Sequence, residues 1–280
     1  MSVHPSYTAD SPDKIIGGHS TPPRIRLLGL PVDRVSLHDA LDILTAHIET
    51  QRTLAAGAPR RTAQVVTLNP EMLMRARTEA ELRAVIQAAD LVVADGVGIL
   101  WAARLLGMPL PGRVPGVDLA QGLAQRAAEH NYRLFLLGAA PGVAEAAARR
   151  LKCLFPGLHV AGTFAGTPQC EGDAEAIAHI QESQAEVVLV AYGAPEQEYW
   201  IERAQGQLDA AVAIGVGGTL DFLAGRVPRA PQWMRARGLE WLYRLWREPW
   251  RWRRMLALPR FALVVVLAAM RTKIGRGVTS

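Results

Sequence analysis

The feature that most constrains the fold of this chain is a recurring pattern of short apolar runs that each end at a glycine or a polar residue. One run, 91–94, is followed by Asp95 and Gly96, and another, 133–137, is followed by Gly138. The runs are almost continuously apolar instead of alternating, which indicates strands buried on both faces. Stretches with helical spacing separate them, and strands joined in this way are typical of parallel βαβ crossovers.

The sequence therefore predicts an α/β fold: a doubly wound, mostly parallel sheet with helices on both faces. Strands are expected at 63–67, 91–94, 133–138, 158–162, 186–192 and 210–216, after a short β element at 25–28 and 31–35. Ser36 is expected to cap the first helix. The spacing Thr78-x-x-Glu81 predicts a capping box for a later helix, and Asp118 is expected to cap a helix that runs to His130.

The bulk composition is that of a globular protein. The chain has 280 residues, of which 50% are hydrophobic and 20% charged, so neither wholesale disorder nor a polytopic membrane protein is indicated. Met1 to Pro23 is polar and lacks the apolar core of a signal peptide. The two cysteines, Cys153 and Cys170, suggest no disulfide framework and fit a reducing cytosol. We expect a flexible arm at 1–24, an α/β domain at 25–227 and a helical appendage at 228–280.

The C-terminal segment has a different composition. From Pro228 to Ser280 there are eleven Arg and one Lys but only two Glu, a net charge of +10 in a chain whose total is +5. Five of the seven tryptophans lie among these arginines: Trp233, Trp241, Trp246, Trp250 and Trp252. Such a basic, Trp-rich appendage is typical of an amphipathic helix at an anionic membrane surface.

Three alternatives remain for this segment: a lipid surface, nucleic acid, and a helical packing or homo-oligomer surface. Arg and aromatic residues also bind nucleic acids. The apolar run Phe261 to Met270 favours lipid, because a nucleic-acid surface has no use for it. Ten helical residues span about 15 Å against the roughly 30 Å of a bilayer core. Adding Met255 to Leu258 lengthens the run, but Pro259 and Arg260 interrupt it, which disfavours a spanning helix.

Polar residues at the ends of the predicted strands are the candidates for chemistry, because the carboxyl ends of parallel strands meet at one edge of a sheet. Asp95 is either a general base or a helix cap. Thr67 and Asn69 either orient a substrate or form a turn before Pro70. Arg113, in a Pro/Gly loop, is either a diphosphate ligand or a solvated charge. Gln197 is either a substrate contact or a first-turn helix residue.

Glycines at the same strand ends are expected to bring the backbone close to a substrate: Gly96, Gly138, Gly193, Gly217 and Gly218. The segment Gly215 to Thr219 resembles a phosphate-cradling loop. It is not Gly-x-Gly-x-x-Gly, and Asp221 is too near to be the ribose-binding acid of a dinucleotide site. No Walker lysine, no Asp-x-Asp pair and no histidine at ligand spacing is present. We therefore expect no cofactor and no metal.

Five motifs, taken together in order and spacing, resemble the WecG/TagA/CpsF glycosyltransferase family over about residues 25–260. They are Thr-Leu-Asn-Pro-Glu at 67–71, Ala-Asp-Gly-Val-Gly at 94–98, Arg-Val-Pro-Gly at 113–116, Gly-Ala-Pro-Glu-Gln-Glu at 193–198 and Gly-Val-Gly-Gly-Thr-Leu-Asp at 215–221. The resemblance implies a bacterial enzyme of surface polysaccharide synthesis. Such an enzyme moves a sugar from a UDP-sugar to a saccharide on polyprenyl diphosphate, with inversion at the anomeric carbon. The sugar is expected to be glucose, N-acetylmannosamine or its uronic acid.

The resemblance also implies roles for single residues. Asp95 matches the proposed base, and Thr67, Arg113 and Gln197 match residues that line the cleft. Arginines of the tail, here Arg244, Arg251 and Arg254, are expected to reach the lipid diphosphate. The tail would then complete the site as a lid, on a cytoplasmic enzyme held peripherally at the inner face of the plasma membrane. The rival hypothesis is a non-enzymatic nucleotide-sugar or nucleic-acid binding module with a basic tail.

Overall fold

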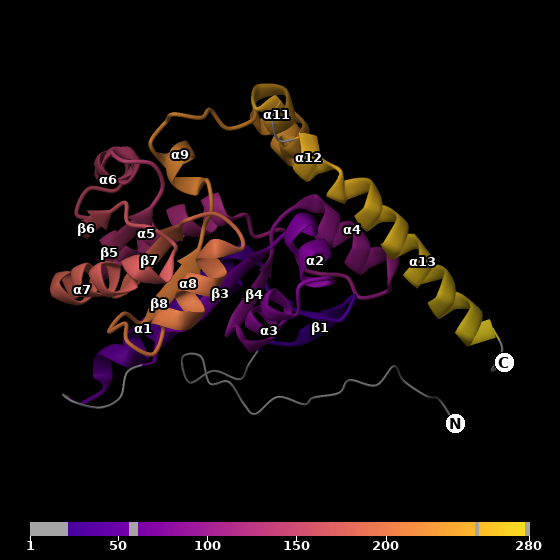
Figure 1. The fold of residues 1–280 in the computed structure, drawn as a ribbon, viewed down its shortest axis with the longest axis horizontal. Coiled ribbons are helices and arrows are strands. Elements are labelled where there is room, and N and C mark those ends of the chain that lie inside the picture. The colour runs from indigo at the N-terminus through magenta and orange to yellow at the C-terminus, as the bar shows by residue number, and fades with distance from the viewer. Residues whose placement is uncertain (1–21, 56–60, 250–251, 278–280) are drawn as a thin grey trace.

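The centre of the molecule is a six-stranded sheet in which every neighbouring pair of strands is parallel (Figure 1). The computed structural model describes residues 22–55, 61–249 and 252–277. The strand order is β4-β3-β8-β7-β5-β6. The strands are β3 (Ala63–Leu68), β4 (Leu91–Ala94), β5 (Arg133–Gly138), β6 (His159–Phe164), β7 (Val187–Ala191) and β8 (Val212–Gly215). The predicted sheet is confirmed.

Helices cover both faces of the sheet, as predicted for a doubly wound fold. One face packs against α1 (Leu37–Thr53), α5 (Gly116–His130), α6 (Val143–Leu154) and α9 (Thr219–Leu223). The other face packs against α2 (Pro70–Ala76), α3 (Ala80–Ala88) and α4 (Val97–Leu105) near β3 and β4, and against α7 (Asp173–Ser183) and α8 (Glu196–Ala204) near β5 and β7. A short 3-10 helix, η1 (Cys170–Gly172), precedes α7.

The continuous apolar runs follow from this two-sided cover. In β5, Leu134 and Leu136 belong to the core under α1, α5 and α6, whereas Phe135 and Leu137 belong to the core under α7 and α8. Successive side chains of a strand point to opposite faces, so both sets need apolar residues. The sequence pattern is thus a direct record of burial on both sides.

A two-stranded antiparallel hairpin, β1 (Arg24–Leu27) and β2 (Leu30–Asp33), lies beside the edge strand β4. Asp33 holds it there: its Oδ2 accepts from the Val92 backbone N–H at 2.7 Å, and Arg24 pairs with both carboxylate oxygens at 2.7 and 2.9 Å. The carboxylate therefore satisfies a backbone donor of an edge strand, which protects that edge from pairing with another chain.

Of the three predicted helix caps, one is confirmed and two are wrong. Ser36 caps α1 in a capping box with Asp39. The Thr78 box does not form, because α3 begins only at Ala80 with Glu79 as its N-cap, so Thr78 lies one residue too early; its hydroxyl donates to the Arg75 carbonyl at the end of α2. Asp118 lies inside the first turn of α5, which begins at Gly116 after Pro115, and it pairs with an arginine from a distant segment.

The described part of the C-terminal segment forms the helices α10 (Gln232–Ala236), α11 (Glu240–Arg247), α12 (Trp252–Met255) and α13 (Ala257–Gly277). The helix α13 runs along α2 and α4 (Figure 1). Phe261 and Val265 belong to the same core as those helices, and Ala269, a further four residues along, is also buried, whereas Leu263 and Leu267 on the other side are exposed. The predicted apolar run is therefore packed on one side only. No helix in the described ranges is both long and apolar enough to cross a membrane.

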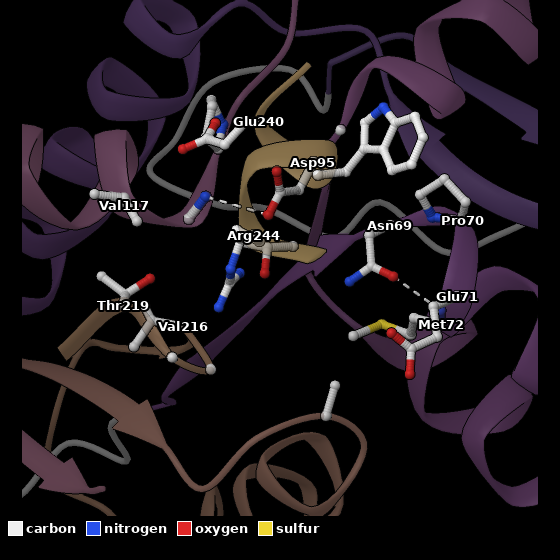
Figure 2. A pocket seen from close by; sticks show the side chains of 18 of the residues that line it. Asn69, Pro70, Glu71, Met72, Asp95, Val117, Val216, Thr219, Glu240 and Arg244 are labelled. Atoms are coloured by element: carbon white, nitrogen blue, oxygen red, sulfur yellow. Dashed lines mark hydrogen bonds between the residues drawn. The ribbon is translucent and has the colours of Figure 1, made fainter. Parts of the chain in front are cut away.

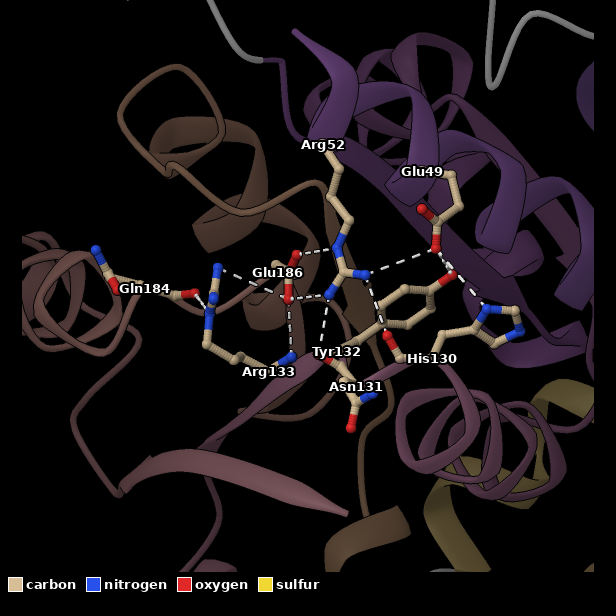
Figure 3. A network of polar contacts seen from close by, with 8 residues as sticks. All are labelled: Glu49, Arg52, His130, Asn131, Tyr132, Arg133, Gln184 and Glu186. Carbon is tan, nitrogen blue, oxygen red and sulfur yellow. Dashed lines mark hydrogen bonds and ion pairs between the residues drawn. The ribbon is translucent and has the colours of Figure 1, made fainter. Parts of the chain in front are cut away.

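A charged network at the amino ends of β5 and β7 connects α1 to Arg133, the first residue of β5, and to Glu186, the residue before β7 (Figure 3). Arg52 donates hydrogen bonds to both carboxylate oxygens of Glu186, at 2.6 and 3.0 Å, and to the carbonyls of His130 and Asn131. Burial raises the pKa of Glu186, but the hydrogen bonds from Arg52 and the Arg133 backbone outweigh it and leave the pKa below its usual value.

We expect the substitution Arg52→Met to lower the free energy of unfolding by about 2–3 kcal/mol at pH 7, because it leaves the largely buried Glu186 carboxylate without its partner. Since the pKa of Glu186 is depressed in the folded state, this stabilisation exists above the unfolded pKa and disappears as the pH falls. Urea denaturation at pH 7 and pH 4 measures both effects. The exposed Arg149 on α6 provides the matched control, Arg149→Met. Equal stability of the two variants at pH 7 would contradict the prediction.

Candidate active site

A cavity of about 320 Å³ lies at the carboxyl ends of β3, β4 and β8, between them and the C-terminal helices (Figure 2). Its floor includes Thr67, Asn69 and Asp95, one wall is the loop at 113–117, and Gln197 and the 216–219 loop form another. Glu240, Trp241 and Arg244 of α11 lie on the remaining side. The predicted convergence of strand ends is therefore found, and the C-terminal appendage contributes to the same cavity.

Asp95 follows β4 directly and points into the cavity (Figure 2). Its backbone N–H donates to the Leu68 carbonyl at 2.8 Å, which fixes it beside β3, and its Oδ2 accepts from the Gly116 N–H at 3.5 Å. Burial raises the pKa of Asp95 to about 6, although the Gly116 hydrogen bond and the charge of Arg113 act in the opposite direction. Asp95 does not cap α4: the N-cap residue is Gly96, and no side chain caps this helix.

Asn69 has the structural role considered from the sequence, and it also lines the cavity. Its side-chain oxygen accepts from the Met72 N–H at 2.9 Å and caps α2. This bond directs the amide nitrogen toward the cavity, where it is a donor available to a ligand (Figure 2). The neighbouring Thr67 donates its hydroxyl proton to the Gly215 carbonyl at 3.0 Å. Its oxygen can then serve a ligand only as an acceptor.

Gln197 is buried and held at both ends of its amide. Its oxygen accepts from the Gly217 N–H at 2.8 Å, and its nitrogen donates to Glu198 Oε1 at 2.8 Å. The space for this pair exists because residue 215 is glycine: a Cβ there would lie 2.5 Å from Gln197 Nε2 and 2.6 Å from Glu198 Oε1. Glu198 therefore fixes the orientation of Gln197, which in turn holds the 217–218 loop.

Arg113 and Arg229 reach the cavity from opposite sides of Glu240. Arg113 Nη1 lies 3.4 Å from Glu240 Oε2, and Arg229 Nε lies 3.5 Å from Glu240 Oε1. Arg229 also makes a shorter ion pair, at 2.6 Å, with Asp118 in the first turn of α5. The loop that carries Arg113 is thereby linked to the C-terminal appendage by charge.

The other predicted site residues differ in position. Gly96, Gly193, Gly217 and Gly218 line the cavity, as does Arg244, whose guanidinium lies over the Phe222 ring at 4.8 Å. Gly138 is not among the lining residues. A Cβ at this position would meet the Ala191 backbone at 2.8 Å, so its glycine is explained by the close approach of β5 and β7. Arg251 lies outside the described residues, and Arg254 belongs to α12 but its side chain lies outside them.

Among the residues not predicted from the sequence, three charged ones take part in the polar contacts described above: Glu198, Arg229 and Glu240. Glu198 stands inside a motif that was recognised, next to Gln197, and Glu240 is one of only two acidic residues in the basic C-terminal segment. An isolated carboxylate among eleven arginines is a signal for a specific ion pair. Within the described ranges, no group of three or more His, Cys, Asp and Glu side chains has an arrangement that could hold a metal ion.

Comparison with known proteins identifies the family. The family model described as "Glycosyl transferase WecG/TagA/CpsF family" matches residues 25–275. The chain belongs to this family. The resemblance seen in the five motifs is confirmed, and it extends through most of α13.

Curated relatives cover nearly the whole length of this WecG/TagA/CpsF family chain. A protein of Bacillus spizizenii is 35% identical over 84% of this chain and 90% of its own length, and one of Bacillus subtilis is 32% identical over 85% and 89%. A Staphylococcus aureus protein is 30% identical over 89% and 95%. Each of these relatives is named N-acetylglucosaminyldiphosphoundecaprenol N-acetyl-beta-D-mannosaminyltransferase.

The buried Glu198 generates a prediction about stability. Burial raises the pKa of Glu198 to about 7, although the hydrogen bond from Gln197 lowers it. The folded state therefore favours the protonated acid, and stability falls as the pH rises from the unfolded value of about 4.5 through 7. We expect Glu198→Gln, which keeps the acceptor for Gln197, to be more stable than the wild type by about 1–3 kcal/mol at pH 8 and by much less at pH 4.5.

Urea denaturation at the two pH values checks this prediction. The control is Glu175→Gln, which makes the same change of charge at an exposed position of α7. If Glu198→Gln has the same free energy of unfolding as the wild type and the control at both pH values, the ionisation of Glu198 does not destabilise the folded protein, and the prediction is wrong.

Proposed function

We propose that this chain is an inverting glycosyltransferase that moves a sugar from a UDP-sugar to a saccharide carried on polyprenyl diphosphate, in the synthesis of a bacterial surface polysaccharide. Membership of the family and the shared name of the relatives support transfer to a polyprenyl-diphosphate-linked N-acetylglucosamine. The same name favours N-acetylmannosamine as the sugar. The observation that carries the proposal is the carboxyl group of Asp95 in a cavity with three arginines.

Asp95 is suited to the role of general base. With its pKa raised to about 6, the carboxylate is mostly ionised at pH 7 yet more basic than an exposed aspartate. A base is most effective when its pKa is near the working pH. Its partial exposure is toward the cavity, where an acceptor hydroxyl would lie.

The proposed reaction is a single displacement. Asp95 accepts the proton of the acceptor hydroxyl, the oxygen forms a bond to the anomeric carbon, and the bond from that carbon to the diphosphate oxygen breaks on the opposite face. UDP leaves with the bonding electrons, and its negative charge is stabilised by Arg113, Arg229 or Arg244, which all line the cavity. Departure without a metal ion stays a prediction, which transfer in the presence of EDTA would test.

We expect Asp95→Asn to lower kcat by about 10²–10⁴-fold, because the amide cannot accept the proton. The measurement is UDP release with a soluble polyprenyl-diphosphate N-acetylglucosamine analogue and a panel of UDP-sugars, including UDP-N-acetylmannosamine. For the wild type, kcat/KM should fall as the pH drops below about 6, as the base becomes protonated. Full activity of the Asn variant would overturn the assignment.

We further propose that α4 and the C-terminal helices form the membrane-facing side of the enzyme, at the inner face of the plasma membrane. Among the described residues, all but one of the exposed large hydrophobic side chains belong to this part of the fold: Val97, Trp101, Leu105, Trp233, Trp241, Leu242, Trp246, Trp252, Leu256, Leu263, Leu267 and Met270. The exception is Leu154 on α6. Exposed apolar side chains gathered on one part of a fold, with arginines among them, are typical of contact with an anionic bilayer.

The pair Leu263 and Leu154 allows a matched test, since their exposed fractions are 61% and 56%. We expect Leu263→Gln to weaken sedimentation with phosphatidylglycerol vesicles by about tenfold or more, because a fully buried leucine contributes about 1.5–3 kcal/mol and about 1.4 kcal/mol corresponds to a factor of ten. Leu154→Gln should leave sedimentation unchanged. Equal behaviour of the two variants would refute a membrane role for this face of α13.

A further inference from the structure

We propose that Arg113 and Arg229 form a binding pair for a diphosphate group, and that Glu240 occupies this pair as an internal competitor which has to turn away before the ligand binds. The proposal rests on the proposed function only for the chemical class of the ligand. Arg229 and Glu240 are the new assignments.

The geometry around Glu240 is that of an anion held loosely between two cations. Its two carboxylate oxygens lie 3.4 Å from Arg113 Nη1 and 3.5 Å from Arg229 Nε. Charge-assisted hydrogen bonds of this type are usually about 2.7–2.9 Å long. Two guanidinium groups therefore converge on one carboxylate without forming an optimal bond to it, and a group with more oxygens and more charge would satisfy them better.

Arg229 has binding capacity that the protein does not use. Its Nη1 is held by Asp118 at 2.6 Å, so the guanidinium is anchored. Its Nη2 is buried and has no hydrogen-bond partner among the described residues. A buried donor without a partner costs free energy, and a phosphate oxygen beside Glu240's present position would supply the missing acceptor.

The balance of charges in the cavity also supports the displacement of Glu240 by a diphosphate. Three carboxylates and three arginines line it: those of Glu71, Asp95 and Glu240, and those of Arg113, Arg229 and Arg244. A diphosphate with two negative charges gains little electrostatic attraction from a pocket in which the positive and negative charges cancel. Once Glu240 turns out, the arginines outnumber the remaining carboxylates.

Glu240 is the carboxylate that is able to leave. Asp95 is fixed at the end of β4, whereas Glu240 is the first residue of α11 in the C-terminal appendage, and its two contacts are the long ones. In this proposal a change of the Glu240 side-chain rotamer releases both cations.

The test is isothermal titration calorimetry of inorganic pyrophosphate with the full chain. We expect Glu240→Gln to bind pyrophosphate about fivefold to tenfold more tightly than the wild type, since it removes the competing charge and keeps the shape. Glu175→Gln, with the same change of net charge at an exposed site, should bind like the wild type. Arg229→Lys should bind about fivefold more weakly, because it keeps a charge for Asp118 but loses the forked donors.

Two further titrations show which diphosphate uses the pair. UDP represents the donor and geranyl diphosphate the lipid carrier, and the one whose affinity changes in Glu240→Gln and Arg229→Lys is the ligand. Thermal melting of each variant confirms that it is folded. The proposal is overturned if folded Glu240→Gln binds pyrophosphate, UDP and geranyl diphosphate as the wild type does, or if Arg229→Lys loses no affinity for any of them.

The outcome is separable from that of the proposed function. Tighter binding to Glu240→Gln in a protein that releases no UDP with a polyprenyl-diphosphate acceptor would support the diphosphate pair and contradict the transferase. Normal sugar transfer, together with unchanged diphosphate binding by Glu240→Gln and Arg229→Lys, would support the transferase and contradict the diphosphate pair.

Discussion

The chemistry proposed for this protein depends on the burial of the Asp95 carboxyl group. This group lies in the space between the strand ends and the C-terminal helices, away from bulk water. An exposed aspartate is a weak base, whereas burial raises the pKa of Asp95 to about 6. The parallel sheet supplies the position, because Asp95 follows β4 and is bonded to the end of β3. The appendage supplies part of the cover, through Glu240, Trp241 and Arg244.

The two sides of the cavity are held in different ways. The sheet side is fixed by short hydrogen bonds: Asn69 to α2, Thr67 to β8, and Gln197 between Glu198 and the 217 loop. The appendage side is held by the apolar stripe of α13 on α2 and α4, by the short ion pair of Arg229 with Asp118, and by the longer ion pairs of Glu240. Ligand-dependent change is therefore expected at Glu240, because its longer contacts can be exchanged at little cost.

Much of the fold could be predicted from the sequence because the signals are local. Continuous apolar runs mark strands buried on both faces, and the polar residues after them mark the edge where the cavity lies. The errors at Thr78 and Asp118 have a common cause: each helix begins at a different residue from the one predicted, α3 only at Ala80 and α5 already at Gly116. Local spacing does not fix the exact residue at which a helix begins.

Arg229 and Glu240 were missed because their importance comes from tertiary contacts, and Glu198 because its burial is not visible in the sequence. Arg229 meets Asp118 across 111 residues, and Glu240 meets Arg113 across 127. Asn69 shows the converse case, in which a structural and a binding interpretation of one side chain are compatible, since its oxygen caps α2 while its nitrogen faces the cavity.

The titration of the Asp95 carboxyl group tests the central claim most directly. Carboxyl ¹³C NMR of the full chain, with the Asp95 signal assigned by its loss in Asp95→Asn, measures the pKa of this group without reference to any substrate. The structure predicts a midpoint near pH 6. A midpoint at or below the ordinary aspartate value of about 3.9 would mean that the cavity does not desolvate Asp95, and would contradict its role as the base.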